Sequence, residues 1–354
     1  MTLLEQNTIE AIDLLKKLIQ VQSFSREEEG VSEMMADYLS SKGLKVNRQG
    51  NNVWCWAQKY DSAKPTILLN SHLDTVKPSK KWTYDPFQAT IEGDRLTGLG
   101  SNDAGGPLVS LMATFLTLKD TEQKYNLVFA ATAEEEVSGQ KGVASILSEL
   151  GKIDLGVVGE PTQMHMAVAE KGLMVLDCEA HGKTGHAARN EGDNALYKAL
   201  PDIEWFKNHQ FEKVSPHLGA VKMTVTQIQS GSQHNVVPDS CRFVVDIRLN
   251  ECYSNKELHQ IIQNNVKCDV IARSYRLNSS SISMDHPFVK RGIEMGREYY
   301  GSPTTSDQAV MDFTTIKMGP GDSARSHTPD EYILLNEIRE GVKIYIKLLD
   351  GLIV

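Results

Sequence analysis

Apolar residues recur along the chain at spacings that predict alternating helices and strands. Near the N-terminus, apolar side chains three or four residues apart predict a helix over residues 9–19. A second helix is expected to begin at a capping box formed by Ser25 and Glu28 and to end at Gly43. Farther along, strands are expected at 52–57, 66–70, 126–131 and 155–158, and helices at 104–118 and 143–150. This alternation predicts an α/β domain with a largely parallel central sheet flanked by helices.

The pattern changes near residue 170, where strictly alternating apolar and polar positions replace the continuous apolar runs. Strands are expected at 171–180, 220–229, 242–249 and 269–276, and helices at 194–208 and 254–266. The resulting order, β-α-β-β-α-β, is that of a ferredoxin-like α+β module. After His286-Pro287 the helical pattern of the first part returns. We therefore expect one α/β domain formed by residues 1–170 and 285–354, with a second domain, residues 171–284, inserted into it.

Composition narrows the classes of function that this chain can have. A length of 354 residues suits about two domains, and the net charge of −9 comes without any block of basic residues. Nucleic acid and acidic membranes are therefore disfavoured as partners. No apolar run reaches the roughly 18 residues of a membrane span, and the N-terminus has no signal-peptide pattern. The five cysteines include no CxxC pair, which favours reduced thiols and a cytoplasmic protein.

Polar clusters follow three of the expected strands and precede one of the expected helices. They are SHLD at 71–74, GSNDAGG at 100–106, EEE at 134–136 and GEPT at 159–162. Each alone has an ordinary explanation, such as a surface pair, a helix cap or a solvated helix start. Together with His327, however, they supply two histidines and three or four carboxylates at sheet edges where sites gather. This hard N/O ligand set suits two divalent ions, zinc first, with cobalt or manganese as alternatives.

At these motifs the chain resembles the co-catalytic two-zinc amidohydrolases, a family that includes acetylornithine deacetylase, succinyl-diaminopimelate desuccinylase, aminoacylase and the glutamate carboxypeptidases. The resemblance covers essentially the whole chain and is strongest to the acetylornithine deacetylase branch. It rests on HLDTV at 72–76, GDRLTGLGSNDAGG at 93–106, TAEEE at 132–136, GEPT at 159–162, GKTGHAA at 182–188 and HTPDE at 327–331. Many relatives have an aromatic residue, an arginine and a lysine where this chain has Thr97, Leu99 and Ala104.

The resemblance implies a zinc-peptidase-like catalytic domain with five metal ligands: His72 and Glu160 for one ion, Glu136 and His327 for the other, and Asp103 bridging them. It also implies that Asp74 orients the His72 ring and that Glu135 is the general acid and base. A cis peptide bond is expected between Asp103 and Ala104. By the same likeness, the inserted domain is a lid that also forms a homodimer.

Four polar residues outside the metal set are expected to act on the substrate. By resemblance, His186 polarises the scissile carbonyl, usually from a partner subunit, while Asn235 and Arg248 contact the substrate. The guanidinium of Arg248 could bind a carboxylate through two hydrogen bonds, although the residues alone, without the resemblance, favour a salt bridge at the rim. Thr305 belongs to a loop that resembles a further segment near the substrate.

The resemblance implies hydrolysis of the amide bond of an N2-acyl amino acid, a small substrate that is cleaved with water. The favoured substrate is N-acetylornithine, or else N-succinylornithine or an N-acylcitrulline, and the reaction would then belong to arginine biosynthesis. Alternative substrates that would use the same metal ligands are acyl-lysine, succinyl-diaminopimelate, and the substrates of a dipeptidase or carboxypeptidase. A non-catalytic binding protein on this fold is an alternative of another class. A mononuclear metalloprotease is disfavoured because the chain has no HExxH motif.

Overall fold

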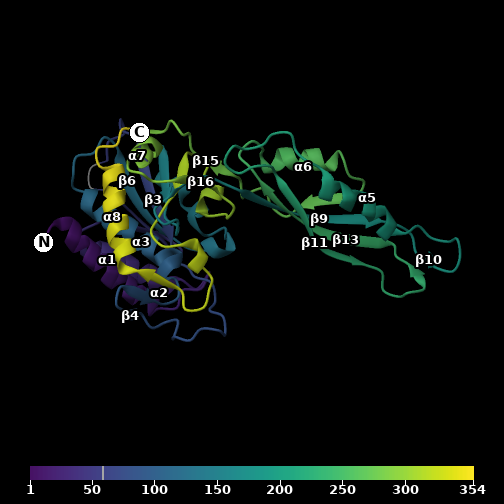
Figure 1. Cartoon of the computed structure of the whole chain (residues 1–354), viewed down its shortest axis with the longest axis horizontal. Coiled ribbons are helices and arrows are strands. Elements are labelled where there is room, and N and C mark those ends of the chain that lie inside the picture. Colours follow the sequence, from purple (N-terminus) through teal and green to yellow (C-terminus); the bar gives the residue numbers. More distant parts are fainter. Residues whose placement is uncertain (58–59) are drawn as a thin grey trace. The chain divides into compact units, whose positions relative to one another are not determined.

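The computed structural model of the chain describes residues 1–57 and 60–354 and divides into two compact units (Figure 1). Unit 1 comprises Met1–Val168, Ser281–Tyr300 and Ser306–Val354, and unit 2 comprises Ala169–Ser280 and Gly301–Thr305. Among the described residues, no helix is both long enough and apolar enough to cross a membrane.

A mixed sheet runs through unit 1, with strand order β1-β2-β6-β3-β7-β17-β8-β15 and with β16 paired to β8. Its strands are β1 (Val46–Gln49), β2 (Asn52–Trp56), β3 (Thr66–His72), β6 (Asn126–Thr132), β7 (Leu155–Val158), β8 (Met166–Glu170), β15 (Ser280–Ser281), β16 (Tyr299–Ser302) and β17 (Thr315–Lys317). The central neighbours β6, β3, β7 and β17 are parallel, whereas β1, β2 and β8 pair antiparallel with their neighbours. The prediction of a largely parallel central sheet is confirmed.

Helices cover this sheet because alternate strand residues bury apolar side chains on both faces. The helices of unit 1 are α1 (Leu3–Ile19), α2 (Glu29–Ser41), α3 (Gly106–Leu118), α4 (Leu147–Leu150), α7 (Pro287–Glu294) and α8 (Leu335–Leu349). Ile67 and Leu69 of β3 pack in the same core as residues of α1, α3 and α8, which contact one another (Figure 1). Leu68, between them in sequence, packs on the other face with Ile146 and Leu150.

The start of the second helix differs from the expected one. The helix α2 begins at Glu29, and neither Ser25 nor Glu28 caps it with a side chain. The Ser25 hydroxyl instead donates to the Asp74 carboxylate at 2.7 Å, and the buried Glu28 carboxylate accepts a hydrogen bond from Asn51 at 2.8 Å. The predicted capping box is therefore wrong, because tertiary partners take both side chains.

Other expected elements are shorter than predicted, and the helix expected at 254–266 spans only Asn255–Gln263. The helix expected at 143–150 is split into a turn, η3 (Val143–Ser145), and the single-turn α4. The strand expected at 269–276 ends at Ala272, as β14 (Asp269–Ala272).

Unit 2 is a four-stranded antiparallel sheet backed by two helices, with strand order β11-β13-β9-β14. In chain order its elements are β9 (Gly172–His181), α5 (Ala195–Asn208), β11 (Lys222–Ser230), β13 (Ser240–Leu249), α6 (Asn255–Gln263) and β14. The predicted β-α-β-β-α-β order is confirmed. Alternate residues of β9, such as Leu176 and Cys178, pack in one core with Phe206 of α5 and Leu258 of α6. A small ribbon pairs β10 (Gly185–His186) with β12 (Val236–Val237).

A second, smaller sheet in unit 1 joins two segments that are distant in sequence. It has the order β18-β5-β4, with β4 (Thr90–Glu92), β5 (Arg95–Thr97) and β18 (Tyr332–Leu334). Unit 1 also contains short helical turns, among them η1 (Ser101–Gly105) after β5, η2 (Glu135–Val137) after β6, η4 (Asp307–Val310) before β17 and η5 (Ser323–Arg325) before β18. The pairing of β18 with β5 brings residues 327–331 beside the loop that carries Asp103.

Candidate metal centre

Parallel strands bring three of the expected ligands to one edge of the central sheet. His72 is the last residue of β3, Glu136 lies in η2 after β6, and Glu160 lies two residues after β7. Because β6 and β7 both run parallel to β3, their carboxyl ends meet at the same edge. Asp103, in the turn before α3, and His327, after η5, reach the same place from the connecting segments.

These five side chains form two groups of potential ligand atoms that share one residue. The first group is His72, Asp103 and Glu160, and the second is Asp103, Glu136 and His327; within each, the ligand atoms lie within 4.8 Å of one another. His72 Nε2 is 3.3 Å from Oδ1 of Asp103, and His327 Nε2 is 3.6 Å from its Oδ2. The two oxygens of Asp103 thus face different histidines. His72 Nε2 also lies 3.9 Å from Glu160, and His327 Nε2 lies 3.0 Å from Glu136.

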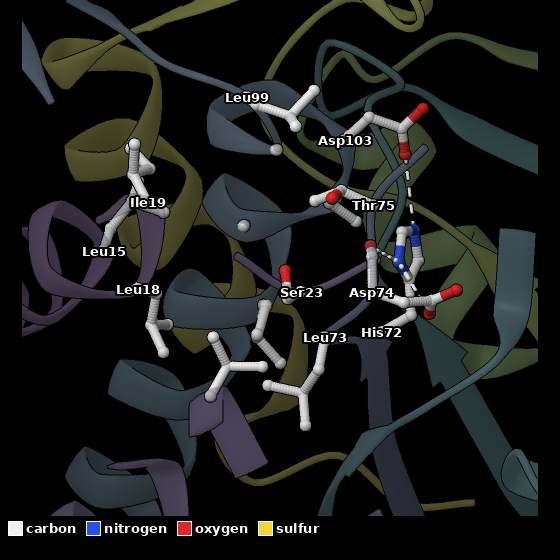
Figure 2. Close-up of a pocket in the computed structure, with 15 residues that line it drawn as sticks. Leu15, Leu18, Ile19, Ser23, His72, Leu73, Asp74, Thr75, Leu99 and Asp103 are labelled. Atoms are coloured by element: carbon white, nitrogen blue, oxygen red, sulfur yellow. Dashed lines mark hydrogen bonds and ion pairs between the residues drawn. The ribbon is translucent and has the colours of Figure 1, made fainter. Parts of the chain in front are cut away.

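Asp74 anchors both sides of the centre. Figure 2 shows the His72 ring with one nitrogen directed at Asp103 and the other at Asp74. That second nitrogen, Nδ1, lies 2.8 Å from the backbone carbonyl oxygen of Asp74 and 3.5 Å from its carboxylate. The carboxylate instead accepts hydrogen bonds from the backbone N–H groups of Glu135, at 3.0 Å, and Glu136, at 3.2 Å. Asp74 therefore orients the ring through its main chain and positions the two glutamates through its side chain.

The turn that carries Asp103 has a tightly folded backbone. The peptide bond between Asp103 and Ala104 is cis, as the resemblance implied. A Cβ atom at Gly105 would overlap the carbonyl oxygen of Gly100, so this position requires glycine. The side chain of Asn102 donates to the Asp322 carbonyl oxygen at 3.0 Å and ties the turn to the segment that precedes His327.

Burial and mutual repulsion of the carboxylates shift the pKa values of the ionisable groups. Burial, and then the charge of Glu160, raises the pKa of Glu135 well above its usual value. Burial and the Asp103 carboxylate raise the pKa of Glu160 to about 8, although His72 and Lys317 act in the opposite direction. The hydrogen bond with Glu136 raises the pKa of His327 to about 9.

For Asp103 and His72, attraction between the two groups outweighs burial. Burial raises the pKa of Asp103, but the hydrogen bond with His72 leaves that pKa lowered. Burial lowers the pKa of His72, but the nearby carboxylates of Asp103 and Asp74 leave it well above its usual value. The centre thus concentrates negative charge around two imidazoles, and added positive charge would relieve its repulsion.

The donor set fits two divalent cations. It consists of two imidazoles and three carboxylates, which zinc and cobalt accept readily, and it contains no thiolate. Glu160 and Glu136 are largely buried at 14% and 8% side-chain exposure, and such carboxylates are costly to keep charged without a partner. Asp103, common to both groups, is placed as a bridging ligand would be.

Four residues expected to contact the substrate lie in unit 2: His186, Asn235, Arg248 and Thr305. His186 is exposed in β10, where its Nδ1 accepts a hydrogen bond from the N–H of Ala188 at 3.1 Å. Arg248 of β13 makes a two-point pair with Asp246, at 2.9 and 3.2 Å. The guanidinium thus forms a salt bridge, as the residues alone favoured, and its substrate role stays a prediction.

Two residues around the centre were given no such role from the sequence, Glu331 and Ser25. The buried carboxylate of Glu331 accepts backbone hydrogen bonds from the turn that carries Asp103. A signal for it existed, because Glu331 ends the HTPDE motif that begins at His327. Ser25 donates to Asp74 from a segment whose sequence indicated only a helix cap, so no local signal could have identified it.

Comparison with known proteins places these observations in a family. The sequence profile described as peptidase family M20/M25/M40 matches residues 68–351. A succinyl-diaminopimelate desuccinylase of Wolbachia pipientis is 26% identical over 290 residues, which are 77% of this chain and 72% of that protein. A protein of Pyrobaculum aerophilum, named as a LysW-lysine/LysW-ornithine hydrolase, is 26% identical over 94% of both chains. The crystal structure of aminopeptidase PepT from Bacillus cereus shares the fold, with a TM-score of 0.77, 18% identity and coverage of 97% of this chain and 98% of that one.

Proposed function

The chain belongs to peptidase family M20/M25/M40, whose members are metal-dependent hydrolases of amide bonds, and we propose that its substrate is an N2-acyl amino acid. The observation that carries this proposal is the pair of ligand groups that share Asp103, with the carboxylate of Glu135 4.0 Å from His72 Nε2. Such a centre suits addition of water to an amide carbonyl, followed by release of an amine. N-acetylornithine is the first candidate, followed by N-succinylornithine and the N-acylcitrullines, with a place in arginine biosynthesis.

The side chains of the centre have distinct proposed roles. His72, Glu160, Glu136 and His327 would hold two divalent ions, zinc first, with Asp103 between them. When bound, the ions would lower the pKa of a water molecule and polarise the amide carbonyl. Glu135 would accept the proton of the attacking water and deliver it to the departing nitrogen. Its carboxylate is 12% exposed, and its raised pKa suits a group that must hold a proton between these steps.

The names of two relatives support an acylated amino acid as the substrate. One is named for the desuccinylation of succinyl-diaminopimelate and the other for hydrolysis of LysW-lysine or LysW-ornithine. Succinyl-diaminopimelate carries its acyl group on an amino acid nitrogen. Desuccinylation is therefore as well supported as deacetylation, and acyl-lysine and succinyl-diaminopimelate remain direct competitors of acetylornithine.

The test is amine release from a panel of amides. The panel contains acetyl- and succinyl-ornithine, acetyl- and succinyl-citrulline, acetyl-lysine, succinyl-diaminopimelate and simple dipeptides, each with zinc, cobalt or chelator. Turnover of one acyl amino acid that the chelator abolishes would support the proposal. Turnover of dipeptides alone would favour a dipeptidase. A protein that binds no divalent ion would instead favour the binding-protein alternative.

Asp74→Asn is expected to lower kcat roughly 10–100-fold with little change in KM, because outer partners of a metal centre contribute on that scale. The Asp74 carboxylate now accepts hydrogen bonds from the backbone N–H groups of Glu135 and Glu136. Asparagine has only one oxygen and would face one of these N–H groups with its own NH2 group, so one of the two hydrogen bonds would be lost. Steady-state kinetics on the best panel substrate would measure the change. Ser25→Ala is the matched control, because it removes one donor to the same carboxylate and leaves both backbone hydrogen bonds. A larger loss in the serine variant would contradict this role of Asp74.

Unit 2 is proposed to form a homodimer and to supply His186 to the substrate carbonyl. Its sheet has two edge strands, β11 and β14, and Ile228 of β11 is 53% exposed, which suits pairing with a second copy. His186→Ala is expected to lower kcat roughly 10²–10³-fold, the usual effect of losing one oxyanion donor. His234→Ala, which removes another exposed histidine, is the control.

A mixing experiment tests whether His186 acts on the partner's site. Mixed dimers of His186→Ala and Glu135→Gln protomers would regain activity if one protomer supplies the histidine and the other the glutamate. Mixed dimers that stay inactive would contradict action between subunits. A protein that is monomeric and fully active would contradict the dimer itself.

A further inference from the structure

Glu331 has a buried carboxylate beside the metal centre without belonging to either ligand group. The residue is 2% exposed. Its Oε1 accepts hydrogen bonds from the N–H groups of Asn102 and Asp103, each at 2.9 Å, and its Oε2 accepts one from the N–H of Gly100 at 3.3 Å. Three main-chain donors of a single turn therefore converge on one side chain.

The main chain of Glu331 holds the same turn from a second direction. Its carbonyl oxygen accepts hydrogen bonds from the N–H of Gly98, at 3.0 Å, and from the Ser101 hydroxyl, at 3.3 Å. Residues 98–103 are thus tied to residue 331 along their whole length. The turn has little freedom to move the side chain of Asp103 while these contacts persist.

The position of Glu331 itself depends on contacts outside the centre. Its neighbour Tyr332 pairs with Thr97 in the small sheet of β18 and β5. On its other side, the Asp330 carboxylate accepts hydrogen bonds from the N–H and the hydroxyl of Thr83, at 2.8 and 2.6 Å. No ligand residue takes part in these anchors, so they can place the Glu331 carboxylate before any ion binds.

We propose that Glu331 is a positioning residue of the metal centre, which holds the turn of Asp103 so that its two oxygens face the two ligand groups. The inference rests on the proposed metal centre and adds a determinant of its affinity. Because Asp103 is common to both groups, a looser turn would weaken both ions together. Glu331 takes no part in the chemical step and acts only through Asp103.

The test is a cobalt(II) titration of the chelator-treated protein, followed by visible absorption and without any substrate. Glu331→Ala is expected to raise the dissociation constants of both ions roughly 10–100-fold, the usual effect of losing an outer partner of a metal ligand. Glu331→Gln retains the size of the side chain and one acceptor oxygen, so its loss should be smaller. A positioning role predicts that cobalt affinity is lowest in Glu331→Ala, intermediate in Glu331→Gln and highest in the wild type.

Asp202→Asn is the matched control. Asp202 of unit 2 is also buried, and it also accepts two backbone hydrogen bonds, from Lys267 at 3.1 Å and Cys268 at 2.8 Å. This variant is expected to lower the melting temperature of the metal-free protein while leaving cobalt affinity unchanged. If Glu331→Ala does not fold, the cobalt affinities of Glu331→Gln and Asp202→Asn are compared instead, and the proposal requires the weaker binding in Glu331→Gln.

Wild-type cobalt affinity for both ions in a folded Glu331→Ala protein would overturn the proposal. The same conclusion would follow if Asp202→Asn weakened cobalt binding as much as Glu331→Gln, because the effect would then be one of general stability. A wild-type protein that binds no cobalt would overturn this inference and the proposed metal centre together. A protein that binds two ions with the expected order of variants but hydrolyses no amide would contradict the proposed function alone.

Discussion

Replacing Glu135 by glutamine is expected to lower kcat by roughly 10²–10⁴-fold, the usual contribution of a positioned general acid and base. Glutamine has nearly the same size but can neither accept the proton of water nor deliver it to the leaving nitrogen. Glu135 belongs to neither ligand group, so the variant should still bind two ions. Its backbone N–H would still donate to Asp74, which keeps the neighbouring Glu136 in place. Kinetics on the best panel substrate, with metal analysis of the same sample, would separate chemistry from metal loss.

The adjacent Glu134 provides the matched control for this substitution. Its carboxylate accepts a hydrogen bond from the N–H of Lys141 at 3.2 Å and belongs to neither ligand group. Glu134→Gln should therefore change kcat much less than Glu135→Gln. Equal losses in the two variants would show that the segment tolerates no change, and the assignment of the proton carrier to Glu135 would fail. If the Glu135→Gln variant lost metal, Glu135 would be assigned as a metal ligand and not as the proton carrier.

Replacing Asp103 by alanine is expected to abolish binding of both ions, whereas Glu160→Ala should weaken only one. Asp103 contributes one oxygen near each histidine, and Glu160 belongs to the first group alone. Losing a direct ligand should cost more than the roughly 10–100-fold that an outer partner contributes. Activity of the Asp103 variant should fall to that of the chelator-treated wild type. Equilibrium dialysis against zinc, with metal analysis of the retained protein, would give the number of ions in each variant.

The number of ions that each variant retains also tests whether Asp103 is shared by two metal sites. About one retained ion in Glu160→Ala and none in Asp103→Ala would agree with two groups that share a bridge. If Asp103→Ala retained one tightly bound ion, Asp103 would serve a single site and the bridging assignment would be wrong. If the wild type itself bound only one ion, the second ligand group would have another role.

Much of the fold follows from local patterns that tertiary contacts do not override. The apolar run from Leu127 to Ala131 became the buried strand β6, and Gly43, with a φ of 76°, ends α2 as expected. Local patterns failed where a side chain had a stronger distant partner. Ser25 had the sequence of a helix cap, but its hydroxyl donates to Asp74, which lies on a different segment. Accepting a helix N–H as a cap is only one of several hydrogen bonds open to a serine hydroxyl, and sequence spacing does not rank them.

The sequence by itself determined the chemical types in the centre and the elements that carry them. Two histidines and three carboxylates sit at or near element ends, and only such hard donors are available there. How these donors are grouped follows from no local pattern: the family resemblance implied it, and the tertiary structure supplies the contacts that produce it. Parallel pairing of β3 with β6 and β7 brings His72, Glu136 and Glu160 to one edge, and the pairing of β18 with β5 places Glu331 under the turn of Asp103. The physical reason is that spacing along the chain fixes the direction of a side chain only within one element, whereas its neighbours across elements depend on strand order and packing.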